Sequence, residues 1–442
     1  MTTNTRRAGR AFALALTLAA PLAGCDLTVS DPNATTEDDA FGTRAGLLAS
    51  AVGLQRQYNA VAYDNLVLTT GITTRELAAD NTFANLLDLD AGGPGLATNN
   101  ANVSGYFGEM YQTMATAQNL IEGAQATETV EPALRSGLVA LGHFYKAAAI
   151  GALAVGFTDV VINPTADEPA TYVSRQAALA DAVRLLTEAE QTLAATPPNA
   201  AFTAIVPAGF NLLNSVRAYR ARFALFAGDL ATALAAARSV DPSVTSRFVY
   251  TTDVPNPLYT AISPALGQPS FAVRDNLGLA AVAPGDGRVD YFTDPNPDTS
   301  VNGFPIETAT GFIVGGLAGP LPVYVPDEML LIQAEVFARQ NQPAQAVAAI
   351  NAVRTDTEDP FGLAANLPPY MGPTTQQALF DEIYYNRATE LFLQGLRLED
   401  ARRLNQGSVD ASNAFRRSRN FYPFPQQERL ANPTTTPADP PV

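Results

Sequence analysis

The residues of this chain that could do acid–base, nucleophilic or metal chemistry are few. His143 is the only histidine, so a Ser-His-Asp triad would have no other base. It lies beside Phe144 and Tyr145 in a segment of helical periodicity, where a packed, hydrogen-bonded histidine is the simpler interpretation. One histidine and one cysteine also exclude a metal site built from several such ligands. Carboxylate pairs for glycoside cleavage must face each other across a bond, which sequence does not reveal. We therefore predict no catalytic residue and no cofactor.

Two short acidic runs, at 88–93 and 294–298, could hold calcium. An EF-hand loop requires oxygen ligands at alternating positions, a glycine at the sixth position and a carboxylate at the twelfth. In the first run Gly92 stands where the third ligand should be and Asn99 occupies the twelfth position; in the second, Thr299 replaces the glycine. We interpret both runs as solvated turns and predict no metal site.

A dense group of charged residues near the carboxy terminus could be mistaken for a substrate site. Its members are Arg387, Glu390, Arg397, Asp400, Arg402 and Arg403. On a helix, Glu390 and Arg397 would be two turns apart, and Glu399 could pair with Arg403 at the next turn. We predict a structural role in which ion pairs hold helix faces together.

The first residues predict export and lipid attachment. Arg6, Arg7 and Arg10 precede an apolar run at 11–22 that is too short to span a bilayer with confidence, which is typical of a signal peptide over 1–24. The run ends in Leu-Ala-Gly before Cys25, which resembles the lipobox of bacterial lipoproteins, whose cysteine is acylated (palmitate). An ordinary signal peptide is the alternative, but a lone cysteine could form no internal disulfide after export. We predict lipid attachment at Cys25, followed by a tether at 25–37.

The charge of the chain excludes one class of partner. The formal net charge of −16 becomes −19 when the three arginines of the signal are removed. Such an acidic chain would repel phosphates, so we predict no nucleic acid partner. No further apolar segment of membrane-spanning length is expected after the signal, so the membrane contact should be the lipid anchor alone.

The elements that must position any site are mainly helical. Apolar residues recur at helical spacing in the segments 38–58, 106–127, 132–155, 174–195 and 375–404, the last possibly broken near Gly395. Ser174 can cap the helix that follows it, and two prolines at 197–198 end that helix.

Less regular segments separate these helices. Residues 71–104 are rich in Asn, Asp, Gly and Thr, which indicates an irregular surface excursion. Residues 241–325 lack long periodic helices and contain strand-like pieces at 248–252 and 311–314, so we predict an ordered, loop-rich insert packed on the helices. The tail at 432–442 is rich in Pro and Thr and is predicted to be disordered.

Two helical segments resemble each other. Residues 221–233 can be aligned with 334–346 without gaps, and in both a helix ends at a tight turn before a second begins. Pro343 suits the first turn of such a second helix. Chance similarity between alanine-rich hairpins is the alternative. We predict tetratricopeptide-like pairs, near 134–196, 211–240, 326–354 and 375–404.

Several segments in order resemble the SusD/RagB family of outer-membrane nutrient-uptake lipoproteins. Residues 324–335 resemble the family's helix with an Ala-Glu pair, and 346–354 resemble its Asn-x-x-Arg helix. Residues 383–403 are similar to its Glu-Arg, Glu-Leu, Glu-Gly-x-Arg and Asp-x-x-Arg pattern. Asn386 and Gln394 replace two family carboxylates, which puts the corresponding ion pairs in doubt.

Further matches extend the resemblance over most of the chain. Residues 421–433 resemble the family's terminal Pro-x-Pro, Glu and Asn-Pro signature. Asp31-Pro-Asn, the segment 110–119 and the hairpin at 145–164 agree more loosely and come in the expected order. The resemblance implies a mainly α fold with a single domain over 38–431, in which tetratricopeptide-like hairpins form a platform carrying the loop-rich region.

The resemblance also implies where a ligand binds. It places a shallow site among the loop after the first helices and the loop-rich insert. The candidate residues there are Arg75, Asp80, Asn81, Phe83, Asn85, Asn99, Asn100, Arg274, Asp275, Asn276, Tyr291 and Phe292. Of these we rank as ligand-binding Arg75, Asp80, Asn81, Phe83, Asn99, Arg274 and Tyr291. Amides and carboxylates could bind sugar hydroxyls, and an aromatic ring could stack on a sugar face; the aromatic rings could equally anchor their loops.

The expected function is binding, not catalysis. The resemblance implies a surface protein that captures an extracellular glycan or peptide and passes it to a SusC-like TonB-dependent transporter. The chain has no Trp, which puts a starch-like ligand in doubt. A structural lipoprotein that binds another protein through its repeats is the alternative, and a surface hydrolase is a further one. The family implies the outer membrane, although Asp26 after the lipidated cysteine favours inner-membrane retention in some bacteria.

Overall fold

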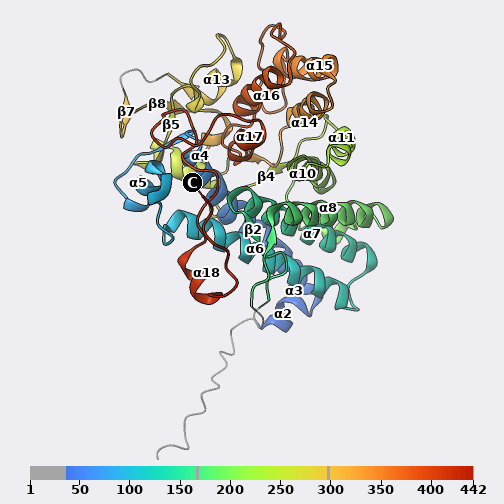
Figure 1. Cartoon of the computed structure of the whole chain (residues 1–442). Helices are drawn as coiled ribbons and strands as arrows, with labels where there is room; N and C mark the ends of the chain where they lie inside the picture. Colours follow the sequence, from blue (N-terminus) through green and yellow to red (C-terminus); the bar gives the residue numbers. More distant parts are fainter. Residues whose placement is uncertain (1–35, 166–168, 296–298, 442) are drawn as a thin grey trace, which may run out of the picture.

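The computed structural model describes residues 36–165, 169–295 and 299–441, and it is mainly helical with a few short strands (Figure 1). The fold class predicted from the sequence is therefore confirmed. The signal at 1–24, Cys25 and nearly all of the tether lie outside the described residues, so lipid attachment stays a prediction.

The first helices form one long, nearly continuous rod. The rod consists of α3 (Arg44–Gln57), a π-helical turn η1 (Tyr58–Ala62) and α4 (Tyr63–Thr73), and α2 (Glu37–Phe41) precedes it across a turn at Thr43 and packs against α3. The sequence predicted a helix only to residue 58. The helix continues because residues 66–73 are all buried, so this apolar and Thr-rich segment packs on every side.

The core is built around α7 (Pro132–Gly156), which packs between α6 (Ala101–Ala126) and α8 (Arg175–Ala195). Every residue from 136 to 156 is buried. Among the described residues this is the one helix long and apolar enough to cross a membrane, contrary to the expectation that no such segment follows the signal. Burial of 94% of its apolar window inside the protein accounts for that composition.

The expected repeat is present as two helical hairpins. The first consists of α10 (Leu212–Ala227) and α11 (Leu230–Ser239), and the second of α14 (Pro326–Arg339) and α15 (Pro343–Arg354). Gly228 and Asn341 occupy equivalent turn positions and have left-handed φ values of 81° and 55°. Glycine and asparagine are the residues that adopt this conformation most readily at a helix end. The equivalent turns confirm the helix-turn-helix interpretation.

The last large hairpin is α16 (Gln376–Glu390) and α17 (Arg397–Arg403). The chain is interrupted between them, where Leu393 and Gly395 have left-handed φ values, so the expected break near Gly395 is confirmed. At the other predicted cap, the side chain of Ser174 accepts from the amide of Ala177 at the start of α8.

The remaining elements are short. The helices are α5 (Ala84–Ala91), α9 (Ala200–Thr203), α12 (Pro257–Ile262), α13 (Gly287–Phe292), α18 (Gln426–Ala431) and the 3-10 turns η2 (Gly93–Gly95), η3 (Pro264–Leu266), η4 (Asp275–Gly278) and η5 (Gly311–Val314). The strands are β1 (Leu77–Ala79), β2 (Asp159–Val160), β3 (Val173–Ser174), β4 (Arg247–Phe248), β5 (Phe271–Arg274), β6 (Thr293–Asp294), β7 (Ser300–Val301), β8 (Phe304–Ala309) and β9 (Leu321–Pro322).

Four local predictions were wrong in whole or in part. The strand expected at 248–252 is only β4, and 311–314 forms the turn η5 instead of a strand. The excursion at 71–104 contains α5, which the Asn- and Asp-rich sequence around it concealed. The tail expected to be disordered is ordered over 432–441, because Asp439 pairs with Arg429 of α18 and accepts from the amide of Phe424.

Candidate functional site

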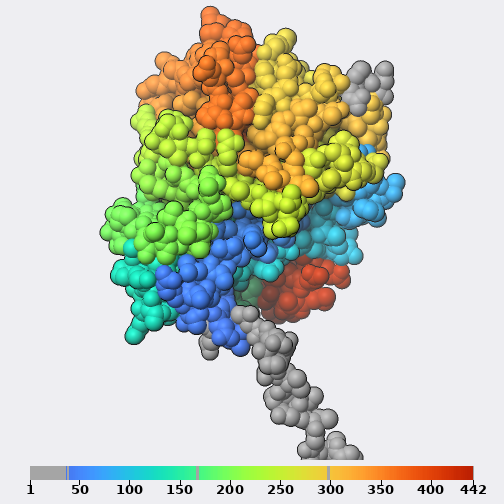
Figure 2. Space-filling view, turned by 180° about the vertical axis from the view of Figure 1, so that it is seen from behind, coloured from blue at the N-terminus to red at the C-terminus, as the bar shows by residue number. Residues whose placement is uncertain are grey.

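A small antiparallel sheet joins the two regions in which a ligand site was expected. Its strand order is β1-β5-β8-β6, with β7 paired to β8. Leu77 of β1 lies opposite Val273 of β5, and Val273 lies opposite Glu307 of β8. The loop after the first helices and the loop-rich insert therefore meet, as the light-blue and yellow surfaces at one edge of Figure 2 also show.

A groove of about 140 Å³ lies along this sheet, and we call it the sheet groove. Its apolar wall comes from α12, η3 and β5, and its polar groups from the end of β1 and from β8. The lining residues with the clearest chemistry are Asp80, Pro264, Pro269, Phe271, Glu307 and Thr308. An apolar wall beside oxygen acceptors is the composition that a sugar ring with its hydroxyls requires.

The two carboxylates of the sheet groove are held in partly desolvated positions. Partial burial raises the pKa of Asp80. Burial and the nearby carboxylate of Asp275 raise the pKa of Glu307, whose Oε2 is buried without a hydrogen-bond partner among the described residues. A buried acceptor without a partner is costly, and a ligand hydroxyl would satisfy it.

Phe83, three residues after the groove-lining Asp80, has an exposed aromatic ring. With 62% of its surface accessible, Phe83 is the most exposed aromatic residue among those described, followed by Phe415 at 52%. The side chain of Asn81 accepts from the amide of Phe83 at 3.0 Å and so fixes the turn that presents the ring. Asn99 is also exposed. Of the predicted ligand-binding residues, Phe83 and Asn99 are thus exposed, and Asp80 and Asn81 are half-buried.

The two predicted arginines, by contrast, make internal contacts. Arg75 is 1% exposed, pairs with Asp90 at 3.1 Å and donates to the carbonyl of Ala411 at 2.8 Å. Arg274 is 3% exposed, and its guanidinium carbon lies 3.9 Å from the ring centroid of Phe304. Both side chains hold segments together and do not reach the surface.

The predicted aromatic residues of α13 are anchors as well. The hydroxyl of Tyr291 accepts from the amide of Phe312 at 3.1 Å, and its ring packs edge to face on Phe292. Phe292 is fully buried. The alternative considered for these rings, that they anchor their loops, agrees with these contacts.

Two other polar candidates, Asn100 and Asn276, have roles in the local backbone structure. Asn100 caps α6 by accepting from the amides of Asn102 and Val103, and its amide group donates to the carbonyl of Asn85. Asn276 has a left-handed φ of 54° in η4 and is half-buried. Sequence reasoning missed Glu307 and Thr308 of the sheet groove, because only the pairing of β8 with β5 brings them beside Asp80.

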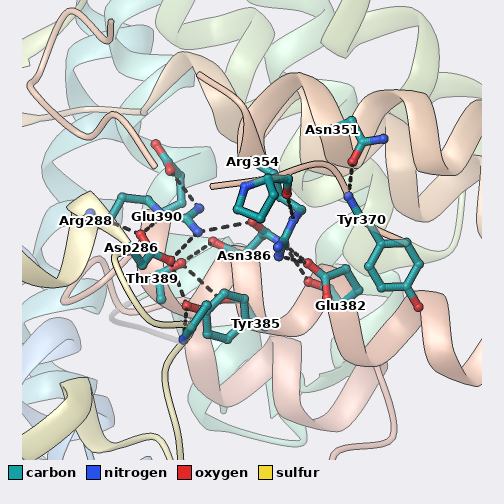
Figure 3. Close-up of polar contacts among 12 residues, drawn as sticks. Asp286, Arg288, Asn351, Arg354, Tyr370, Glu382, Tyr385, Asn386, Thr389 and Glu390 are labelled. Carbon is teal, nitrogen blue, oxygen red and sulfur yellow. Dashed lines mark hydrogen bonds and ion pairs between the residues drawn. The ribbon is translucent and has the colours of Figure 1, made fainter. Parts of the chain in front are cut away.

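Glu390, one of the charged motif residues near the carboxy terminus, belongs to an internal network with Arg288, Asp286 and Asn386 (Figure 3). Arg288 is fully buried and donates to Asp286, Glu390 and Asn386. Burial alone would raise the pKa of Asp286, but the hydrogen bonds from Arg288 hold it below its ordinary value. Asn386 also donates to Glu382, so its amide bridges a cation and an anion where the family has a carboxylate.

The family's Asn-x-x-Arg pair lies in the same network. Asn351 accepts from the amide of Tyr370 at 2.7 Å, and Arg354 pairs with Glu382 (Figure 3). The expected pair between Glu399 and Arg403 is wrong: Glu399 accepts from Arg402 and Arg175, whereas Arg403 pairs with Glu335 and Asp400. The geometry supports the structural role predicted for this group.

The residues considered for catalysis and metal binding lie in separate places among the described residues and do not form a common site. Burial lowers the pKa of His143 to about 4, and its Nδ1 has no partner among the described residues, so the expected hydrogen bond is absent at that atom. Asp90 belongs to α5 and pairs with Arg75, so the first acidic run is not a turn. Part of the second run lies outside the described residues. Within the described ranges, no group of three or more His, Cys, Asp or Glu side chains could hold a metal ion.

Comparison with known proteins assigns this architecture to a class. The overall fold is similar to that of solved proteins described as members of the SusD superfamily. A SusD superfamily protein of Bacteroides thetaiotaomicron matches with a TM-score of 0.68 and 14% identity over 92% of this chain and 100% of its own. A SusD-like carbohydrate-binding protein of Bacteroides fragilis matches with a TM-score of 0.67 and 18% identity over 90% and 100%.

A third solved relative carries a ligand. The surface glycan-binding protein A of Bacteroides thetaiotaomicron, in complex with laminarihexaose, matches with a TM-score of 0.65 and 16% identity over 90% of this chain and 99% of its own. Residues 324–437 match the model of the SusD family. No curated protein sequence matches the chain. The carboxy-terminal part of the chain therefore matches the family that its motifs resemble, and the fold of the chain is that of solved SusD superfamily proteins.

Proposed function

We propose that this chain is a surface lipoprotein that binds an extracellular glycan through the sheet groove and Phe83. The observation that carries the proposal is one groove that combines an apolar wall with the unsatisfied acceptor of Glu307, and whose lining residue Asp80 lies three residues before the exposed ring of Phe83. Relatives described as carbohydrate-binding support the same ligand class. The chain itself is proposed to be a binding protein without catalytic activity.

The ring of Phe83 would stack on a sugar face, and Asp80 and Glu307 would accept hydroxyl hydrogens. Stacking on an exposed aromatic ring contributes roughly 1 kcal/mol or more beyond the area buried. We therefore expect Phe83→Ala to weaken binding of a cognate oligosaccharide about tenfold in calorimetric titration.

Phe415→Ala is the matched control for that substitution, because it removes another exposed phenylalanine at a distinct groove. That groove is lined by Tyr384, Tyr385 and Arg416 and has a volume of about 490 Å³. Unchanged affinity in Phe415→Ala supports the assignment. A loss in Phe415→Ala with none in Phe83→Ala would move the glycan site to the other groove.

The proposed role includes delivery of the glycan to a SusC-like TonB-dependent transporter in the outer membrane. A lipid at Cys25 would keep the chain beside the pore, and weak, exchangeable binding suits handover because a tight complex releases slowly. We expect a large TonB-dependent barrel to co-purify with the chain from native outer membranes. Its reproducible absence, with a different membrane partner present, would favour the structural lipoprotein instead.

A further inference from the structure

A second groove, on the helical platform, is lined largely by arginine. It lies where the start of α8, the α10–α11 turn, the end of α14 and α17 come together, and it has a volume of about 400 Å³. We call it the arginine groove. Its charged lining consists of Arg175, Arg339, Arg402, Arg403 and Glu399. None of these residues contributes to the sheet groove.

Arg403 is the most buried of these arginines, with a side chain 8% exposed. Its Nε and Nη2 donate to Glu335, and Nη2 also donates to Asp400. Its Nη1 is buried and has no acceptor among the described residues. A buried charged donor without a partner costs free energy that a bound anion would recover.

In both Arg175 and Arg339, Nε and Nη2 donate hydrogen bonds within the described part of the chain, whereas Nη1 does not. Arg175 donates from Nε to the carbonyl of Ala154 and from Nη2 to Glu399. Arg339 donates from Nε to Glu335 and from Nη2 to the carbonyl of Arg403. Within the described part of the chain, the Nη1 of each makes no hydrogen bond. Three guanidinium groups around one groove thus retain donors for an external acceptor.

The ion pairs around the arginine groove leave an excess of positive charge. Two ion-pair clusters meet there: Arg175 and Arg402 share Glu399, and Arg339, Arg387 and Arg403 share Glu335 and Asp400. Five cations against three anions leave two positive charges, in a chain whose net charge is −16. The carboxylate of Glu399 in the lining is neutralised by Arg175 and Arg402, so it does not exclude an anion.

We propose that the arginine groove binds a carboxylate on an acidic peptide segment of a partner protein. Arginine donors suit carboxylates because the planar guanidinium can donate two parallel hydrogen bonds. Leu225, Phe226 and Leu230 form an apolar wall beside the arginines, which suits an apolar side chain next to the acidic one. An inorganic anion would use the donors but leave that wall bare. This site is independent of glycan binding at the sheet groove.

The test is titration of the full chain with a fluorescent hexapeptide of alternating leucine and glutamate, its leucine–glutamine counterpart and inorganic phosphate. We expect saturable, salt-sensitive binding of the glutamate peptide only. Arg339→Gln should weaken that binding about tenfold, since it removes one charge-assisted donor set. Arg184→Gln is the control, because Arg184 is an exposed arginine of α8 that pairs only with its own helix.

Thermal unfolding of each variant separates loss of the site from loss of the fold, and Arg175→Gln provides a second variant on another helix. Weaker peptide binding by folded Arg339→Gln and Arg175→Gln, with Arg184→Gln unchanged, supports the proposal. Equal binding of the two peptides, no peptide binding, phosphate binding without peptide binding, or equal affinity in all variants overturns it. Glycan titration of the same samples reports on the sheet groove separately.

Discussion

Replacing Glu335 with Ala should destabilise the protein by about 3–5 kcal/mol, because it leaves buried cations without their anion. Glu335 is fully buried and accepts from Nε of Arg403 at 2.7 Å, from Nη2 of Arg403 at 2.8 Å and from Nε of Arg339 at 2.8 Å. These contacts join α14 to α17. The loss should be measured by urea denaturation at neutral pH.

The stabilisation by Glu335 should depend on pH. Burial alone would raise the pKa of Glu335, but Arg403 and Arg339 lower it from 4.5 to about 2. Its folded pKa is depressed, so its stabilisation is fully present above about 4.5 and is lost as pH falls through about 2. The difference in stability between the native chain and Glu335→Ala should therefore narrow as pH falls toward 2.

Glu188→Ala is the control for this effect. Glu188 pairs with Arg184 at the surface of α8, with its side chain 42% exposed, so its loss should cost no more than about 0.5 kcal/mol. A loss in Glu335→Ala no larger than that of the control would contradict the structural role of the buried network.

Gly278→Ala should cost at least about 3 kcal/mol, since strain and a backbone collision act together. Gly278 has φ of +75°, and a Cβ there would lie 1.8 Å from the carbonyl oxygen of Arg75. The absence of a side chain at Gly278 thus lets the backbone of η4 pack closely on Arg75, just before β1 and next to the sheet that forms the sheet groove. Chemical denaturation should show the loss.

Gly316→Ala separates the two causes in Gly278→Ala. Gly316 also has a positive φ, +105°, but a Cβ there would meet nothing within 4 Å. It should lose only about 1 kcal/mol, from backbone strain alone. Similar losses in the two variants would show that the close approach at Gly278 is not the cause.

The helical part of this fold was predictable because its signals are local. Ser174 caps α8, and the left-handed residues Gly228 and Asn341 end equivalent helices, so short stretches of sequence contain the information. The helix α5 and the end of the long first rod were missed because polar, turn-forming residues surround or fill them. There, tertiary burial outweighed local propensity.

The candidate site was only half predictable, for a related reason. Asp80 and Asn81 follow a strand and keep part of their surface exposed, as polar turn residues usually do, and the turn presents Phe83 to solvent. Arg75 has the same kind of neighbours in sequence, yet its guanidinium is buried against Asp90 and the carbonyl of Ala411. Ala411 lies more than three hundred positions from Arg75, and one sequence does not reveal that the two residues meet.

The central claim, that this chain binds a glycan and leaves it intact, is tested most directly by one measurement. The full chain is titrated calorimetrically against a panel of defined oligosaccharides, and each sample is then analysed by mass spectrometry. We predict saturable binding of at least one oligosaccharide, recovered at its original length. Shortened products, or no binding across a panel that binds a known glycan-binding control, would contradict the account.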